Sequence, residues 1–165
     1  MKPIRLLKHL LLPDWYVRRV FARGDLTAIG EAIAASEKSH RGELRFVVEA
    51  AMPLTALWRD QLPRARAVDL FSTLRVWDTA ENSGILIYVQ LVERRVEILA
   101  DRGIAARVPQ AEWDDICREM ETSFRHGRWR EGALQAVTRS GALLTQHFPA
   151  GASNPDELPD QPLML

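Results

Sequence analysis

The sequence predicts an α/β protein in which a small mixed β-sheet, formed by a parallel crossover and an antiparallel hairpin, is sandwiched between helices. The run GILIYVQLV at residues 84–92 is apolar at both alternating sets of positions, which is typical of a central strand covered on both faces. The segment ELRFVVEA at residues 43–50 is rich in β-branched and apolar residues and predicts a second strand. The segment RRVEILA at residues 94–100 alternates apolar and polar residues and predicts a third.

Helices are expected before, between and after these strands. Asp25 is a residue type that caps helices. Leu26, Ile29 and Ile33 follow it at helical spacing, so we expect a helix that ends near Ser39–His40. Apolar stripes of the same kind predict three further helices, which cover about residues 64–75, the segment that Pro109 opens, and roughly residues 128–147.

The connections between the strands predict their directions. A helix lies in the link between the first two strands, so these strands should run parallel with a right-handed crossover. Only Glu93 and Arg94 separate the second and third runs, which predicts a hairpin. The beginnings of the first two strands and the end of the third should therefore meet at one edge of the sheet.

The chain has 165 residues, enough for one domain with a substantial core. We expect a helical N-terminal segment over residues 1–23 and the α/β domain over residues 24–148. Residues 149–165 contain four prolines and show little periodicity, so we expect a flexible tail there.

The composition narrows the classes of function. Twenty-two basic and twenty-two acidic side chains balance, so no basic surface for nucleic acid is expected. Cys117 is the only cysteine, which excludes an internal disulfide. No apolar run is long enough for a signal peptide or a membrane span, so we expect a cytoplasmic protein. The basic, leucine-rich residues 1–23 either pack on the domain or contact an anionic membrane peripherally.

Polar side chains gather at the sheet edge where the three strand ends are expected to meet. Carboxylate and amide oxygens are ligands that suit Ca²⁺ or Mg²⁺. The predicted metal ligands are the four such residues at this edge, namely Glu43, Asp78, Asn82 and Asp101. The alternative interpretation is that Asp78 and Asn82 only hydrogen-bond the loop backbone, as in Asx-turns.

Three segments, in this order and spacing, resemble the TPM-domain family: SEKSHRGELRFVVE, VWDTAENSGILIY and RRVEILADRG. The family includes thylakoid acid phosphatases and photosystem repair proteins, and the resemblance covers about residues 24–148. It implies a sheet between helices, divalent-cation binding in some members and phosphatase activity in a few. In this sequence Asp101, Arg102 and Gly103 stand where many members carry Gly-Tyr-Gly.

Two functions follow as hypotheses. The first is a cation-binding regulatory or interaction module that binds a protein partner. The second is a divalent-cation-dependent phosphatase acting on small phosphomonoesters. In that enzyme Arg102 or Arg41 would bind the phosphoryl oxygens and His40 would protonate the leaving group. No cysteine-phosphatase or nucleotide-binding signature is present in the sequence.

Overall fold

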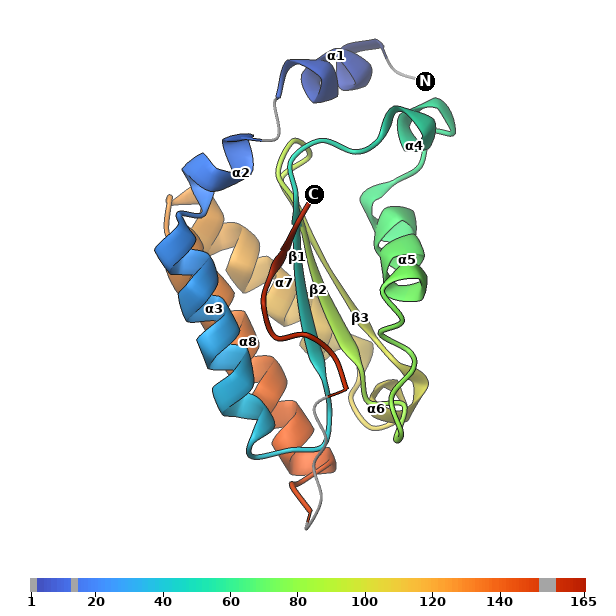
Figure 1. Ribbon diagram of the computed structural model, residues 1–165. Coiled ribbons are helices and arrows are strands. Elements are labelled where there is room, and N and C mark those ends of the chain that lie inside the picture. The colour runs from blue at the N-terminus through green and yellow to red at the C-terminus, as the bar shows by residue number, and fades with distance from the viewer. Residues whose placement is uncertain (1–2, 13–14, 152–156) are drawn as a thin grey trace.

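A four-stranded mixed sheet forms the centre of the molecule, with the strand order β3-β2-β1-β4 (Figure 1). The computed structural model describes residues 3–12, 15–151 and 157–165. The strands are β1 (Leu44–Glu49), β2 (Ile85–Gln90), β3 (Arg95–Ala100) and β4 (Leu163–Met164). The predicted fold class, a small mixed sheet between helices, is confirmed.

The three predicted strands pair in the predicted directions. β1 and β2 are parallel, with Leu44 opposite Ile85, and β2 and β3 are antiparallel, with Ile85 opposite Ala100. Every residue of β1 and β2 is buried, as their apolar sequences lead one to expect for strands covered on both faces. In the turn between β2 and β3, Arg94 adopts a left-handed backbone with φ of 53°.

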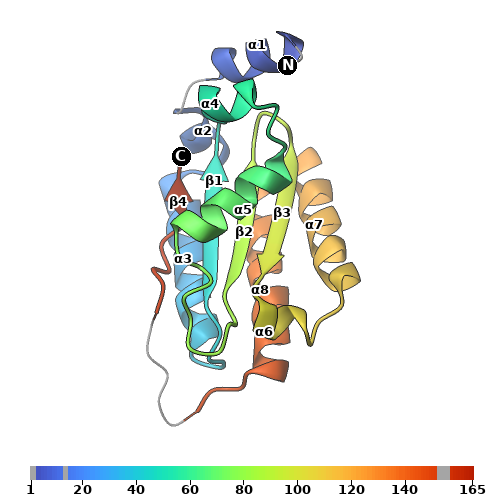
Figure 2. The same ribbon diagram turned by 90° about the vertical axis from the view of Figure 1, so that its right-hand side faces the viewer.

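Helices cover both faces of the sheet (Figures 1 and 2). Phe46, Val48 and Ile87 point into the larger core, which the sheet shares with α3 (Arg23–Glu37), α7 (Gln110–Arg125) and α8 (Trp129–His147). Val47, Leu86 and Tyr88 alternate with them and point into a smaller core beneath α5 (Pro63–Thr73). Two short helices, α4 (Leu54–Trp58) and α6 (Arg102–Ala105), were not predicted from the sequence.

The start of α3 differs from the prediction. Ala22, not Asp25, is the N-cap, and Asp25 is the third residue of the helix. The Asp25 carboxylate accepts a hydrogen bond from the Ala22 backbone N–H at 3.0 Å, so it still satisfies a free donor of the first turn. Its negative charge also lies near the positive end of the helix dipole.

The prediction of a flexible tail does not hold for residues 157–165. β4 pairs parallel with β1, and the Leu165 N–H donates to the Val48 carbonyl at 2.9 Å. Leu158 is buried in the smaller core, and the Arg45 guanidinium donates to the Gln161 carbonyl at 2.7 Å. The apolar residues among the prolines therefore cover the open edge of β1, which would otherwise expose unpaired backbone groups.

The N-terminal segment forms two helices, α1 (Pro3–Leu11) and α2 (Trp15–Val20). The sequence also predicts that Pro13 breaks the helical segment, but Pro13 lies outside the described residues. Val17 and Phe21 are buried in the larger core, where the Phe21 ring packs edge-on against Phe46 and Phe124. In the part of the chain that the structure describes, no helix is both long and apolar enough to span a membrane.

Candidate functional sites at the two ends of the sheet

Backbone hydrogen bonds join the three predicted site segments at the amino end of β1 and β2. The Ile85 N–H donates to the Glu43 carbonyl at 2.8 Å, and the Asp101 N–H donates to the Gly84 carbonyl at 2.9 Å. The Gly103 N–H donates to the Asn82 carbonyl at 2.9 Å. The parallel crossover and the hairpin thus bring the polar segments to one edge, and the side chains determine which of them can act together.

One compact set of polar groups at this edge is the Asp101 corner, formed by Glu81, Asn82, Asp101, Arg102 and Gly103. Asp101 is the N-cap of α6, and its Oδ1 accepts from the Arg102 N–H at 2.7 Å. The Arg102 Nε donates to the Asn82 Oδ1 at 3.0 Å. The second carboxylate oxygen, Asp101 Oδ2, is buried and has no hydrogen-bond partner within the described structure.

Gly103 allows the start of α6 to pack closely against the backbone of Glu81 and Asn82. A Cβ atom at this position would lie 2.4 Å from the Glu81 carbonyl oxygen and 2.6 Å from the Asn82 carbonyl oxygen. Both distances are far below van der Waals contact, so only glycine fits unless the backbone moves. Asn82 adopts a left-handed backbone with φ of 53°, which asparagine tolerates better than most residues. The corner therefore presents several oxygen atoms within a small volume.

Two other predicted ligands have different surroundings. Asp78 forms an ion pair with Arg75, three residues earlier, and nearly half of its side chain is exposed. Glu43 is buried, and its Oε2 accepts from the Leu158 N–H of the tail at 3.1 Å. The four predicted ligands therefore lie along the same edge of the sheet, but Asp78 and Glu43 are engaged with protein groups outside the Asp101 corner.

An acidic cluster at the start of β1 comprises the buried residues Glu37 and Glu43 and the half-buried Asp160. Glu37 Oε1 accepts from the Leu44 N–H at 3.0 Å. Burial and a hydrogen bond with Asp160, together with the neighbouring charges of Glu43 and Asp160, raise the pKa of Glu37 to about 9. Glu37 is therefore protonated at neutral pH. The prediction of functional residues from the sequence missed both Glu37 and Asp160.

His40 is fully buried behind this edge. Its Nδ1 lies 2.9 Å from the Gly42 carbonyl, which can only accept, so Nδ1 carries the proton. Nε2 lies 2.9 Å from Ser36 Oγ and accepts its proton. Burial lowers the pKa of His40, so the ring is neutral near pH 7. Both ring nitrogens are therefore engaged by groups of the protein.

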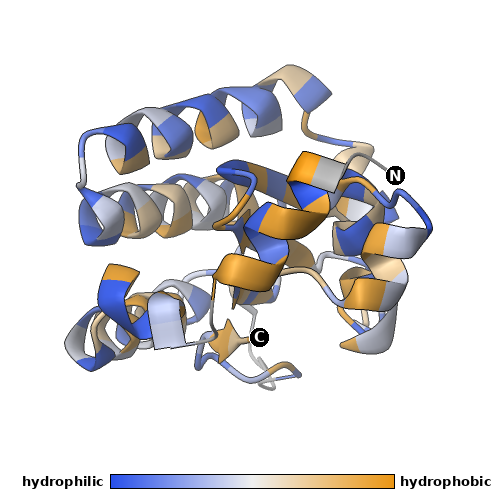
Figure 3. Cartoon of the chain, turned by 90° about the horizontal axis from the view of Figure 1, so that it is seen from above, coloured by the Kyte–Doolittle hydropathy of each residue, from blue (hydrophilic) through white to orange (hydrophobic). Residues whose placement is uncertain are grey.

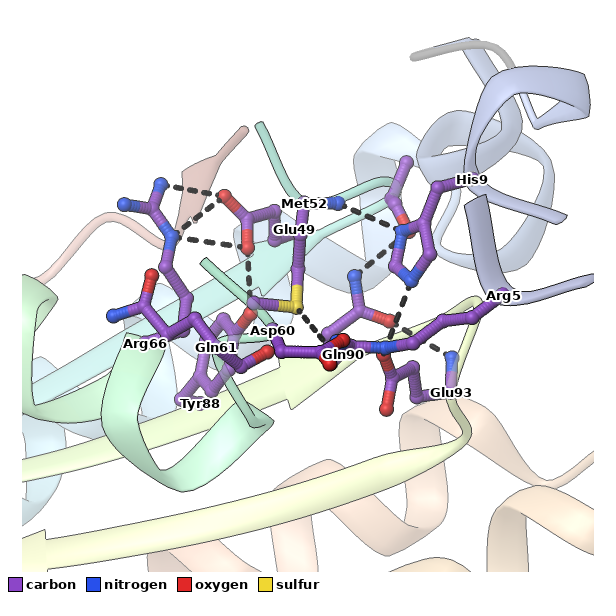
Figure 4. Close-up of polar contacts among 11 residues, drawn as sticks. Arg5, His9, Glu49, Met52, Asp60, Gln61, Arg66, Tyr88, Gln90 and Glu93 are labelled. Carbon is purple, nitrogen blue, oxygen red and sulfur yellow. Dashed lines mark hydrogen bonds and ion pairs between the residues drawn. The ribbon is translucent and has the colours of Figure 1, made fainter. Parts of the chain in front are cut away.

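The carboxyl end of the sheet holds a second polar network that was not predicted (Figure 4). Glu49 is almost fully buried at the end of β1 and forms an ion pair with Arg66 of α5 at 2.6 Å. The Tyr88 hydroxyl donates to the same carboxylate at 2.5 Å. Burial and the charge of Glu49 raise the pKa of Tyr88 far above its usual value. The ion pair and the hydrogen bond satisfy the Glu49 charge within the protein.

A second group of polar contacts at this end of the sheet includes residues of α1 (Figure 4). The Met52 N–H donates to His9 Nδ1 at 3.0 Å, so the His9 proton is on Nε2, which donates to Glu93 at 3.1 Å. The Arg5 Nε donates to the same Glu93 carboxylate at 2.5 Å, and its Nη2 donates to the Gln61 carbonyl at 2.5 Å. These contacts fasten α1 to the hairpin turn and to the segment after α4.

The side chains at the two ends of the sheet limit the set of ligands that a metal ion could have there. Within the described residues, no group of three or more His, Cys, Asp or Glu side chains is placed to hold a metal ion. A cation at either end would therefore need carbonyl, amide or water oxygens beside at most two carboxylates. Ca²⁺ accepts such mixed oxygen ligands.

The fold and the polar amino edge define a small α/β sandwich domain, and comparison with known proteins specifies its kind. The chain belongs to the TPM-domain family, whose model matches residues 18–143. No curated protein matches the chain.

Two solved structures share its architecture. The BA42 protein from the psychrophilic bacterium Bizionia argentinensis is similar with a TM-score of 0.73 and 27% sequence identity, over 87% of this chain and 94% of that one. The N-terminal domain of a protein from P. gingivalis has a TM-score of 0.63 and 17% identity, over 85% of this chain and 94% of that one. The second likeness shows the fold alone.

Proposed function

We propose that this TPM-domain protein is a divalent-cation-binding regulatory or interaction module, with Ca²⁺ or Mg²⁺ bound at the Asp101 corner. The observation that carries the proposal is the buried Asp101 Oδ2 atom, which lacks a hydrogen-bond partner in the described structure. Burying a carboxylate oxygen without a hydrogen-bond donor lowers the stability of the folded protein. A bound cation is one group that would remove this cost.

Neutral oxygens near Asp101 could complete such a site. Asn82 Oδ1 and the Glu81 carbonyl belong to the same corner, and both are hard oxygen ligands. Arg102 now donates to Asn82, so its guanidinium would have to move away when a cation binds. Because only one carboxylate contributes, we expect weak binding, with a dissociation constant on the order of 10⁻⁴–10⁻³ M.

Thermal melts with and without Ca²⁺ or Mg²⁺ test this proposal, because a ligand that binds only the folded state raises its stability. At a tenfold excess over the dissociation constant the gain is about 1.4 kcal/mol. For a chain of this length that corresponds to a rise in melting temperature of about 3–6 °C. Potassium chloride at equal ionic strength controls for charge screening.

Asp101→Asn isolates the proposed ligand, because asparagine can still cap α6 while the carboxylate charge is lost. We expect this variant to melt normally in EDTA and to lose the cation-dependent rise. The matched control is Asp78→Asn, whose side chain is paired with Arg75 at the surface and should leave the rise intact. A wild-type protein that does not respond to either cation, or an Asp101→Asn variant that responds fully, would contradict the proposal.

Hydrolysis of phosphomonoesters is the other activity that the family resemblance implies, and the geometry supports it less well. The proposed proton donor, His40, is buried with both ring nitrogens engaged by Gly42 and Ser36. General acid catalysis needs the donor within hydrogen-bond reach of the leaving group. We therefore expect no turnover of a generic phosphomonoester, with Ca²⁺, Mg²⁺ or EDTA. Metal-dependent turnover that Arg102→Met abolishes would favour the enzyme instead.

A further inference from the structure

Helix α1 is amphipathic in the opposite sense to a helix that packs on a core. Its polar residues Arg5 and His9 face the protein, and His9 is almost fully buried. Its outward face consists of large apolar side chains that are 55–71% exposed, namely Ile4, Leu7, Leu10 and Leu11. Residues 4, 7 and 11 share one side of a helix, and residues 5 and 9 share the opposite side.

Specific polar contacts hold α1 in this orientation (Figure 4). Glu93 accepts from both Arg5 and His9, and His9 accepts from the Met52 N–H. On the same side, Leu6 packs against the small cluster of Met52 and Leu57 below it. Rotating the apolar face inward would break these contacts and leave Glu93 without its partners. The exposed face is therefore fixed by the fold.

The apolar surface continues beyond α1. α4 lies beside α1 at the same end of the molecule (Figures 1 and 2). Viewed from that end, α1 crosses the front of the protein and is coloured mainly as hydrophobic (Figure 3). Exposed apolar residues also lie on or next to α4, namely Leu54, Trp58 and Leu62. We call this set, together with the outward face of α1, the α1–α4 surface.

Among the described residues, three exposed cations border the α1–α4 surface: Lys8 on α1, Arg59 directly after α4, and Arg94 in the hairpin turn next to α1. Asp60, next to Arg59, is an exposed acidic residue. The Asp60 carboxylate lies 3.7 Å from the Arg5 guanidinium, which forms a closer ion pair with Glu93 at 2.5 Å. A cavity of about 1040 Å³ opens between α1 and the hairpin turn. Lys8 and Arg94 line it beside apolar residues such as Leu11 and Leu91. Glu93 also lines it, and its carboxylate is engaged by Arg5 and His9.

From this combination we propose that the α1–α4 surface docks on an anionic lipid membrane. A helix that lies in the membrane interface carries leucine and tryptophan on one side and lysine or arginine at the margin. Tryptophan is enriched at the level of the lipid headgroups, and Trp58 of α4 is largely exposed. The cations around the rim complement the negative headgroups, and the cavity can accept a headgroup phosphate beside its apolar wall. This inference is independent of the proposed cation site.

Sedimentation with lipid vesicles tests the docking. The full chain in EDTA is mixed with vesicles of phosphatidylcholine alone or of phosphatidylcholine with phosphatidylglycerol. We expect it to bind the anionic vesicles, bind the neutral ones weakly, and dissociate as salt is raised. Leu7→Glu with Leu11→Glu should weaken binding to anionic vesicles about tenfold or more, because two inserting side chains become charged. Lys8→Gln should weaken it about fivefold.

Val68→Glu is the matched control, since Val68 is also an exposed apolar residue but lies on α5, and it should bind as the wild type does. Melting curves check that the α1 variants fold. If the paired leucine variant does not fold, Lys8→Gln decides the matter on its own. Absence of wild-type binding to anionic vesicles, or equal binding by all variants, would overturn the inference. A lipid-free dimer that the paired leucine variant dissociates, without vesicle binding, would assign the surface to a second copy.

Discussion

The carboxyl group of Glu37 makes the stability of this protein depend on pH. Its pKa in the folded protein is raised to about 9 from an ordinary 4.5, chiefly by burial. A raised pKa means that the folded state holds the proton more tightly than the unfolded state. The stabilisation is therefore complete below about pH 4.5 and is lost as the pH rises toward 9.

Glu37→Gln should remove this dependence. The glutamine amide can still accept from the Leu44 N–H and donate to Asp160, but it releases no proton. We expect the variant to match the wild type near pH 5 and to be more stable near pH 8, by on the order of 2 kcal/mol. Denaturant unfolding at the two pH values measures the difference in the free energy of unfolding.

Glu31→Gln is the control, because Glu31 is an exposed residue on the same helix. It should change the free energy of unfolding by the same small amount at both pH values. An equal effect of Glu37→Gln at both pH values would show that Glu37 is not protonated in the fold.

The sequence contains a signal for Glu37 but none for its partner. Glu37 continues the series Ile29, Ile33 at a spacing of four, so an acidic residue occupies an otherwise apolar stripe. A buried carboxyl group follows from that position. Asp160 gives no such indication, because its segment has no periodicity and its place beside Glu37 depends on how the tail folds back. The Asp78 pairing with Arg75 is likewise a matter of side-chain geometry, which strand directions do not determine.

At the level of elements, the C-terminal segment contributes more than its sequence indicates. The fold needs cover for the edge of β1, and β4 provides it through the Val47–Leu163 and Val48–Met164 pairs. Pattern-based prediction fails here because two residues are too few to show a strand period. The longer strands and helices were predictable because their apolar periodicity extends over six or more residues.

Removal of residues 157–165 should therefore destabilise the protein. The deletion takes away the buried Leu158 side chain and the backbone donor that Leu158 gives to Glu43. We expect a loss of about 2 kcal/mol or more, which corresponds to a fall in melting temperature of about 4–8 °C. Leu158→Ala should reproduce part of that fall. A melting temperature that does not change on truncation would mean that the segment packs without contributing to stability.

At the level of the whole molecule, the sheet separates two different surfaces. The Asp101 corner lies at the amino end of β1 and β2, and the α1–α4 surface lies beyond their carboxyl end (Figure 1). The polar edge was predictable because strand directions bring distant segments together. The outward direction of the apolar face of α1 was not predictable, because the apolar face of a strongly amphipathic helix normally packs on its own domain. In α1 the polar residues Arg5 and His9 contact the domain instead, and these contacts are visible only in the structure.

This separation predicts that the two proposed sites act independently. Substitutions that are far apart and share no partners usually have additive effects. The paired Leu7→Glu and Leu11→Glu variant should therefore keep the whole rise in melting temperature with Ca²⁺ or Mg²⁺. Asp101→Asn should bind anionic vesicles as the wild type does, in EDTA and in the cation alike. These variants and their combination form a double-mutant cycle, with melting and vesicle sedimentation as separate readouts.

A cation that strengthens vesicle binding in the wild type but not in Asp101→Asn would show that the sheet couples its two ends, because coupling between two ligands is reciprocal. Equal strengthening in both proteins would instead place the cation between the protein and the lipid headgroups.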